Sequence, residues 1–257
     1  MGTLAYETKD NVALLTIQSP PANALSTSLL KDLNEHLDKI ENDTNVKAVI
    51  LKGEGKFFSA GADIKEFTSL QDASDYQSLS ERGQRLFDRV ENFSIPVIAA
   101  IHGAALGGGL ELAMSCHIRI VTENAKLGLP ELTLGIIPGF AGTQRLPGYV
   151  GTAKAYEMIL TGTPISGGEA HQFGLANHAV SEEELVEKSM KLATAIAAKS
   201  KPTINNVMHL IPYAKTARFA DGVREEAEAF GKIFGSEDAK EGVQAFIEKR
   251  KPNFQDK

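Results

Sequence analysis

The sequence predicts an α/β protein that ends in an all-helical region. Short continuous apolar runs, at residues 46–51 and 96–101, alternate with segments whose apolar residues recur every three or four positions. Such runs are typical of parallel strands, because helices cover both faces of the sheet. From about residue 182 onward only helical periodicity remains. We therefore expect a core over residues 1–199 and a helical region over residues 200–257.

The first elements are a predicted hairpin and a capped helix. Residues 12–18 form an apolar strand pattern, and residues 4–8 are its expected hairpin partner. Ser26 is a residue type that caps helices. The helix after it has one apolar stripe, made of Leu29, Leu30, Leu33, Leu37 and Ile40.

The later elements follow the same alternation. A helix is predicted near residues 76–93, with Leu79, Leu86, Val90 and Phe93 on one side. Residues 46–51, 96–101 and 118–121 are predicted strands. The C-terminal helices are expected to break at Pro202 and Pro212, because proline cannot donate a backbone hydrogen bond.

Composition excludes several classes of protein. The chain has 257 residues, a net charge of −6 and 42% hydrophobic residues, with a pI of about 5.6. No nucleic-acid partner is expected, because a general nucleic-acid binder needs a basic face. The single cysteine, Cys116, cannot form an intramolecular disulfide and fits a reducing compartment.

No targeting, membrane or cofactor motif is present in the sequence. The first ten residues lack an apolar or arginine-rich signal, and no run of 18 apolar residues occurs. We therefore expect a cytoplasmic protein without a membrane partner. Phosphate-binding, dinucleotide-binding and nucleophile-elbow motifs are missing, and the six histidines lack metal-ligand spacing. The prediction is no metal and no redox cofactor.

Two glutamates beside turns of small or rigid residues carry the chemistry. Residues 105–111 read Ala-Leu-Gly-Gly-Gly-Leu-Glu, ending at Glu111, and residues 128–131 read Gly-Leu-Pro-Glu, ending at Glu131. Glycines that open a helix leave backbone N–H groups accessible to a ligand. Such donors beside two carboxyls suit acid–base chemistry on a carbonyl compound. The alternatives are solvated glutamates and glycines that serve only helix–sheet packing.

These residues resemble the enoyl-CoA hydratase (crotonase) family. Residues 56–65, Lys-Phe-Phe-Ser-Ala-Gly-Ala-Asp-Ile-Lys, resemble its first oxyanion-hole motif, and residues 107–113 resemble the second. Pro130 and Glu131 carry the second carboxyl. The similarity runs from about Leu4 to Phe254, with the motifs in the family's order. The resemblance implies a crotonase-like ββα spiral core with a C-terminal α-helical oligomerisation region.

The resemblance also implies an activity and its residues. The protein is expected to add water to the C2–C3 double bond of trans-2-enoyl-CoA in fatty-acid β-oxidation, with coenzyme A thioester as substrate and no separate cofactor. The N–H groups of Ala62 and Gly108 would bind the thioester oxygen, with Glu111 as general base and Glu131 as general acid. The residues expected to contact the substrate or its coenzyme A are Lys56, Ala60, Asp63, Ile64, Lys65 and Lys249.

Several alternatives remain open at the level of sequence. An enoyl-CoA isomerase would need only one of the two carboxyls, and a non-catalytic acyl-CoA or RNA-binding scaffold would need neither. The lysines near the first motif can be plain solvated side chains, and Asp63 fits a loop-holding role better than a reactive one. The family usually has aspartate where this chain has His117, which leaves the role of that position undefined.

The C-terminal region carries more aromatic residues than a surface tail should expose. They are Phe219, Phe230, Phe234 and Phe246. The resemblance implies that this region packs between subunits of a homo-oligomer, either a trimer or a dimer of trimers. It also implies that Lys249 reaches a neighbour's coenzyme A, whereas a simple exposed basic tail is the alternative.

Overall fold

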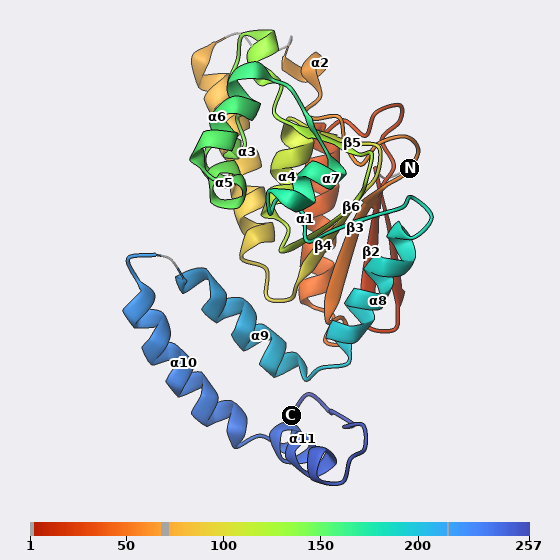
Figure 1. Cartoon of the computed structure of the whole chain (residues 1–257), viewed down its shortest axis with the longest axis vertical. Coiled ribbons are helices and arrows are strands. Elements are labelled where there is room, and N and C mark those ends of the chain that lie inside the picture. Colours follow the sequence, from red (N-terminus) through yellow and green to blue (C-terminus); the bar gives the residue numbers. More distant parts are fainter. Residues whose placement is uncertain (1–2, 68–71, 215) are drawn as a thin grey trace.

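The strands of the main sheet lie in the order β1-β2-β3-β4-β6-β9 (Figure 1). The structure is a computed structural model that describes residues 3–67, 72–214 and 216–257. The strands of this sheet are β1 (Leu4–Lys9), β2 (Val12–Ile17), β3 (Ala48–Gly53), β4 (Val97–Ile101), β6 (Ile118–Thr122) and β9 (His178–Val180). Strand β1 pairs antiparallel with β2, and all other neighbours in this sheet are parallel. The predicted hairpin and the buried parallel strands are therefore confirmed.

A second, three-stranded sheet lies next to the predicted functional motifs. It contains β5 (Ala104–Leu106), β7 (Lys126–Gly128) and β8 (Ile165–Ser166), in the order β5-β7-β8. Strands of two or three residues are too short to show an alternating pattern, so the sequence did not predict them. Strand β5 leads directly into the glycine turn, which fixes where that turn begins.

The helices of the core cover the sheets, and two of them correspond to the helices whose boundaries were predicted. They are α1 (Thr27–Glu41), α2 (Ile64–Phe67), α3 (Ala73–Glu91), α4 (Gly108–Ser115), α5 (Gly142–Val150), α6 (Thr152–Thr161), α7 (Gly167–Gln172) and α8 (Leu185–Ala197). Helix α1 begins as predicted, with the Ser26 side chain accepting from the N–H of Leu29. Helix α3 begins earlier than predicted because Asp72 caps it. It ends before Phe93, which is nevertheless buried.

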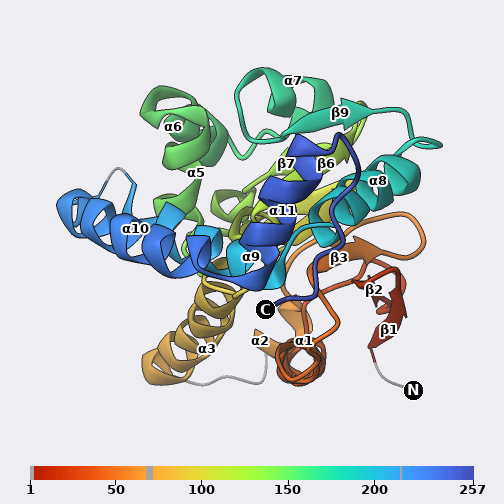
Figure 2. The same ribbon diagram turned by 90° about the horizontal axis from the view of Figure 1, so that it is seen from below.

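The C-terminal region is helical as predicted. It contains α9 (Lys201–Leu210), the 3-10 turn η2 (Ile211–Tyr213), α10 (Phe219–Phe234) and α11 (Glu237–Ile247). These helices extend away from the main sheet (Figure 1), and the view from below shows α10 running out to one side of α11 (Figure 2). The predicted break near Pro202 is the boundary between α8 and α9, and Pro202 lies in the first turn of α9, where a missing N–H has no cost. Pro212 does lie in the turn that ends α9.

The end of the chain ties the C-terminal region to the core. The buried Lys47 ammonium, just before β3, donates to Asp256 at 2.7 Å and to the carbonyl of Lys199 at 3.1 Å. The Asp238 carboxylate of α11 accepts from the N–H groups of Gln255 and Asp256. The last residues therefore fix the base of the helical region against the sheet.

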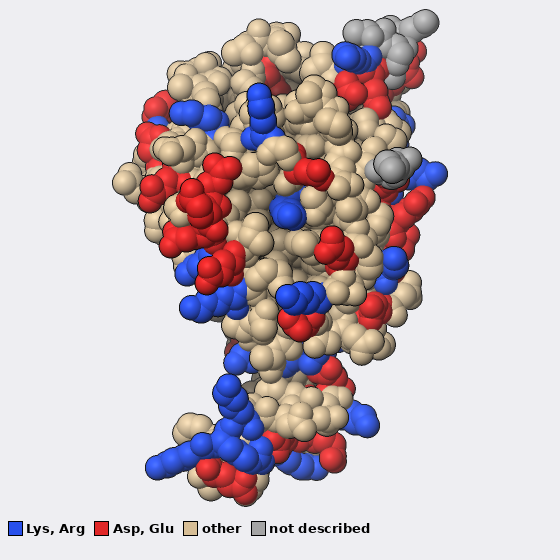
Figure 3. Space-filling model, turned by 90° about the vertical axis from the view of Figure 1, so that its right-hand side faces the viewer, with Lys and Arg blue, Asp and Glu red and all other residues tan. Residues whose placement is uncertain are grey.

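One face of the molecule shows positive and negative side chains interspersed (Figure 3). Lysine and arginine gather at its lower end, beside acidic groups. Near the end of the chain, Arg250 is paired with Glu241 and Glu248. In the described part of the chain, no helix is both long and apolar enough to cross a membrane.

Candidate active site

Glu111 is a buried carboxyl held at a defined position. It lies on α4, a helix whose eight residues are all buried, and is only 1% exposed. Its Oε1 accepts from the N–H of Phe140 at 2.8 Å and from that of Gly142 at 2.7 Å. A buried carboxyl needs such donors because it has lost its water. The expectation of a solvated surface glutamate therefore does not apply here.

Glu131 approaches the same place from another loop. It is the first residue of the 3-10 turn η1 (Glu131–Leu134), directly after Pro130. Its Oε1 lies 3.0 Å from where a Cβ on Gly107 would be, so the carboxyl lies over the turn that opens α4. Among the described residues, its buried Oε2 has no hydrogen-bond partner. A buried acceptor without a partner marks a position where a ligand or water can bind.

The two carboxyls influence each other electrostatically. Burial raises the pKa of Glu111 to about 7, and the negative charge of Glu131 adds to this, while the N–H groups of Gly142 and Phe140 oppose it. Burial also raises the pKa of Glu131. Both pKa values are raised because both carboxyls have lost water. Protons therefore leave the two groups as a coupled pair.

The N–H groups of Ala62 and Gly108 lie close together. Strand β5 brings the two loops into contact, since Ser59 donates to the carbonyl of Ala104 and accepts from the N–H of Leu106. A Cβ placed on Gly108 would lie 3.3 Å from the nitrogen of Ala62. Within the described ranges, neither N–H donates a hydrogen bond to another backbone group. Both are therefore available to a single acceptor atom.

The three glycines at the start of α4 have different physical roles. Gly107 has a φ of 51°, which a residue with a side chain rarely adopts. A Cβ on Gly108 would obstruct the space between Ala62 and Phe140, whereas one on Gly109 would lie 2.4 Å from the carbonyl oxygen of Ser59. Tight packing therefore explains Gly109, and the accessible N–H distinguishes Gly108.

Of the other residues predicted to contact substrate, all but Lys249 lie near Ala62 in the sequence and the structure. Lys56 and Ala60 are exposed on the loop that leads to α2, and Ile64 and Lys65 are exposed in the first turn of α2. Asp63 holds this loop, because its Oδ1 accepts from the N–H of Lys65 at 3.0 Å. Lys249 is also exposed, but it follows α11, at the opposite end of the chain's long axis from α2 (Figure 1). Within one chain the structure therefore does not bring Lys249 to the site.

Phe140 is a site residue that the sequence did not single out. Its N–H binds Glu111, and its carbonyl accepts from Arg145 at 2.9 Å. Arg145 is structural, since it also pairs with Asp88 and Glu91 of α3. The sequence feature that could have indicated Phe140 is an aromatic residue among the small residues of the loop Pro-Gly-Phe-Ala-Gly at 138–142.

Cys116 has no role as a nucleophile. Cys116 caps the end of α4, and β6 begins only at Ile118. The thiol is buried, and burial raises its pKa to about 12. The thiolate needed for nucleophilic chemistry is therefore absent at neutral pH.

His117 has a structural role at the edge of the core. Its Nδ1 accepts from the N–H of Val97 at 2.9 Å, and its Nε2 lies 3.2 Å from the carbonyl oxygen of Glu91. Burial lowers the pKa of His117 to about 4. The neutral ring therefore joins the start of β4 to the end of α3. Aspartate, the family's usual residue at this position, is likewise a hydrogen-bond acceptor.

We expect His117→Ala to lower the free energy of unfolding by about 1–3 kcal/mol, because the N–H of Val97 loses its acceptor. His117→Asp should recover part of this loss, since its carboxylate can accept the same bond. Urea unfolding followed by circular dichroism measures both variants. Equal stability of His117→Ala and the unmodified protein would contradict this role.

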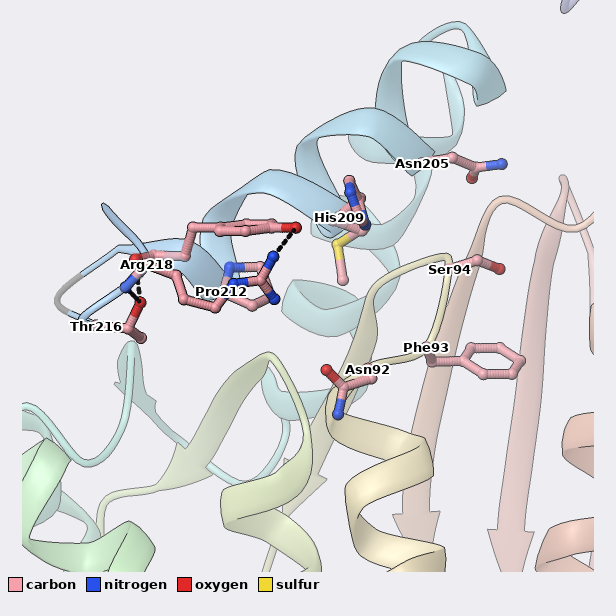
Figure 4. Close-up of a pocket in the computed structure, with 10 residues that line it drawn as sticks. Asn92, Phe93, Ser94, Asn205, His209, Pro212, Thr216 and Arg218 are labelled. Carbon is pink, nitrogen blue, oxygen red and sulfur yellow. Dashed lines mark hydrogen bonds between the residues drawn. The ribbon is translucent and has the colours of Figure 1, made fainter. Parts of the chain in front are cut away.

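A separate cavity of about 450 Å³ lies between the α3–β4 connection and the α9–η2 segment (Figure 4). Its lining includes Asn92, Ser94, His209 and Arg218. None of the candidate site residues lines it. In the described residues, no three His, Cys, Asp or Glu side chains are grouped as metal ligands.

Comparison with known proteins identifies the family of this chain. Residues 7–257 match the family model described as enoyl-CoA hydratase/isomerase. The chain is 57% identical over 255 residues to a probable enoyl-CoA hydratase of Bacillus subtilis, covering 99% of both chains. It is 41% identical to a short-chain-enoyl-CoA hydratase of Clostridium acetobutylicum, covering 98% of this chain and 97% of the relative.

Solved structures give the same result for the fold. The crystal structure of an enoyl-CoA hydratase from Bacillus anthracis superposes with a TM-score of 0.94 at 36% identity, covering 99% of this chain and all of that one. A second enoyl-CoA hydratase, from Geobacillus kaustophilus, gives a TM-score of 0.95 at 32% identity, covering 100% of this chain and 98% of that one. This chain belongs to the enoyl-CoA hydratase/isomerase family and has its crotonase fold.

Proposed function

We propose that this protein is an enoyl-CoA hydratase, which adds water across the C2–C3 double bond of trans-2-enoyl-CoA to give 3-hydroxyacyl-CoA in fatty-acid β-oxidation. One observation carries the proposal: the carboxyls of Glu111 and Glu131 interact electrostatically, and that of Glu131 lies over Gly107, next to the Gly108 residue that approaches the nitrogen of Ala62. The relatives named as hydratases support the same reaction.

The proposed reaction uses the paired N–H groups first. The thioester oxygen accepts from Ala62 and Gly108, which form an oxyanion hole, and this draws electron density away from C3. The N-terminal end of α4 adds a favourable dipole at the same point. Negative charge that develops on the oxygen is therefore stabilised without any rearrangement of the protein.

The carboxyls then move the protons. As water oxygen bonds to C3, Glu111 accepts one of its protons, and the double bond becomes the enolate of the thioester. Glu131, as the member of the coupled pair that holds the proton, delivers it to C2. One proton of the water stays on the new hydroxyl at C3, and the other is on Glu111. Transfer of that proton from Glu111 to Glu131 restores the starting state, so the net reaction adds one water. Lys56, Ala60, Asp63, Ile64 and Lys65 are proposed to bind the coenzyme A portion around this centre.

Loss of the conjugated-enoyl absorbance of crotonyl-CoA on adding enzyme tests the proposal directly. An isomerase would instead convert 3-enoyl-CoA to 2-enoyl-CoA and leave crotonyl-CoA unchanged. The family's name covers both activities. A second positioned carboxyl favours hydration, because isomerisation needs only one group to shuttle a proton. A scaffold that binds without catalysis would do neither reaction.

We expect kcat/KM for crotonyl-CoA to follow a bell-shaped pH profile, because Glu111 must be ionised to accept a proton while Glu131 must hold one to deliver. The pKa of Glu111, about 7, places the rising limb of this profile between about pH 6 and about pH 8. Steady-state rates in buffers of constant ionic strength measure the profile. A profile that is flat through pH 7 would show that Glu111 is not the base.

The assembly is proposed to be a homo-oligomer, a trimer or a dimer of trimers, formed through the C-terminal helices. Four phenylalanines of this region are 59–85% exposed: Phe219, Phe230, Phe234 and Phe246. So much aromatic surface in water is unfavourable, and contact with another copy would remove it. In such an assembly Lys249 is proposed to reach a neighbour's coenzyme A.

Truncation after Gly235 should dissociate the oligomer, because it removes α11 and the residues that hold the helical region to Lys47. Light scattering after size-exclusion chromatography measures the mass. The matched control is Asn253→Ala, which changes the tail but keeps Asp256 and Asp238. A truncated protein with the mass of the full-length oligomer would refute this role of the C-terminal helices.

A further inference from the structure

The ring of Phe140 occupies the space between α3 and the start of α4. The residue is 5% exposed, and its ring packs edge-on against Phe87, with 5.4 Å between the centroids. A Cβ on Gly83 would lie 2.4 Å from Cδ1 and Cε1 of this ring, and a Cβ on Gly108 would lie 3.2 Å from Cδ2 and Cε2. One edge of the ring therefore faces α3, and the other faces the proposed oxyanion donor.

Gly83 leaves the room that this ring needs. It is buried in the middle of α3, where glycine is the least favourable residue after proline. Any side chain at position 83 would displace the ring while Phe140 is present. The Phe140 ring beside Gly108 thus explains why α3 has a glycine at position 83 in place of a better helix former.

The loop that carries Phe140 is anchored on both sides. The carbonyl of Gly139 accepts from the Ser80 hydroxyl and from Gln84 Nε2 of α3. The N–H of Phe140 donates to Glu111 on α4. The ring therefore cannot easily turn away, because its backbone is bonded to both helices that it separates.

An enoyl chain at this site must pass the ring. In the proposed reaction the thioester oxygen lies at Gly108 and C3 lies within reach of Glu111. Phe140 contacts both positions, through its ring at Gly108 and through its N–H at Glu111. Carbon atoms beyond C3 consequently run toward the space that this ring fills.

We propose that Phe140 determines acyl-chain selectivity, by closing the space between α3 and α4 to long chains so that the enzyme prefers short enoyl groups. This inference rests on the proposed hydratase function and adds its substrate class. The exclusion is steric and apolar. Removing the ring opens a hydrophobic cavity into which additional methylene groups can extend.

The test compares kcat/KM for a four-carbon and a ten-carbon trans-2-enoyl-CoA. We expect the unmodified enzyme to favour the shorter substrate. In Phe140→Ala the ratio of ten-carbon to four-carbon kcat/KM should rise about 10-fold or more, since even one methylene in a hydrophobic pocket changes kcat/KM by about that factor. Phe140→Leu should show a smaller rise in the same direction, and serves if the alanine variant does not fold.

Two further variants separate selectivity from general loosening of the core. Gly83→Leu in the Phe140→Ala background refills the space from α3 and should return the ratio toward its original value. Phe93→Ala removes another buried ring, outside the site, and should leave the ratio unchanged. An unchanged ratio in an active, folded Phe140→Ala or Phe140→Leu enzyme overturns this inference alone. Absence of hydration with every chain length overturns the proposed function, and the inference with it.

Discussion

Glu111→Gln and Glu131→Gln are each expected to lower kcat for crotonyl-CoA hydration by about 10²–10⁴, the usual contribution of a positioned acid or base. Glutamine keeps the shape of the side chain and an oxygen that can accept from Phe140 and Gly142. It cannot accept or deliver the proton that the reaction requires. Stopped assays at saturating substrate measure kcat directly, so that a change in binding is not mistaken for a change in chemistry.

The double variant distinguishes cooperation from independent effects. Because both carboxyls act on one water, the loss in Glu111→Gln/Glu131→Gln should be far smaller than the product of the two single losses. Glu123→Gln, an exposed glutamate between the two sites in sequence, is the matched control and should retain normal kcat. Near-normal hydration after either single site change would exclude the mechanism with two carboxyls.

Gly108→Pro is expected to lower kcat by at least about 10²-fold, the effect of removing one oxyanion donor. Proline has no N–H, yet it is tolerated at the first position of a helix, which is where Gly108 lies. The fold should therefore survive, and circular dichroism together with the melting temperature verifies this. A folded variant with full activity would mean that Gly108 serves only packing.

Gly108→Ala separates the lost donor from crowding. Alanine keeps the N–H, but its Cβ would lie 3.2 Å from the Phe140 ring and 3.3 Å from the nitrogen of Ala62. Proline removes the donor and also places a Cδ on the nitrogen, so its kcat should be lower than that of alanine by about a further 10²-fold. Equal losses in the two variants would assign the whole effect to crowding.

Local pattern was sufficient for the long elements and for the residues of the reaction. The helix from Leu29 to Ile40 was predictable because its apolar residues recur with the helical period. Strand β4 was predictable because it is a short, continuous apolar run. The glutamates were recognisable because each follows a distinctive turn. Strands β5, β7 and β8 were not predictable, because two or three residues carry no period and pairing across the sheet decides their structure.

By itself, the sequence determined the family, the α/β class and the identities of the two carboxyls, because these depend on short motifs in order along the chain. Only the tertiary structure decided their surroundings. Burial of Glu111, the fit of Phe140 into the gap at Gly83, and the acceptor role of His117 each join segments that are 20 or more residues apart. Solvent exclusion and close packing arise between such segments, so no local pattern contains them.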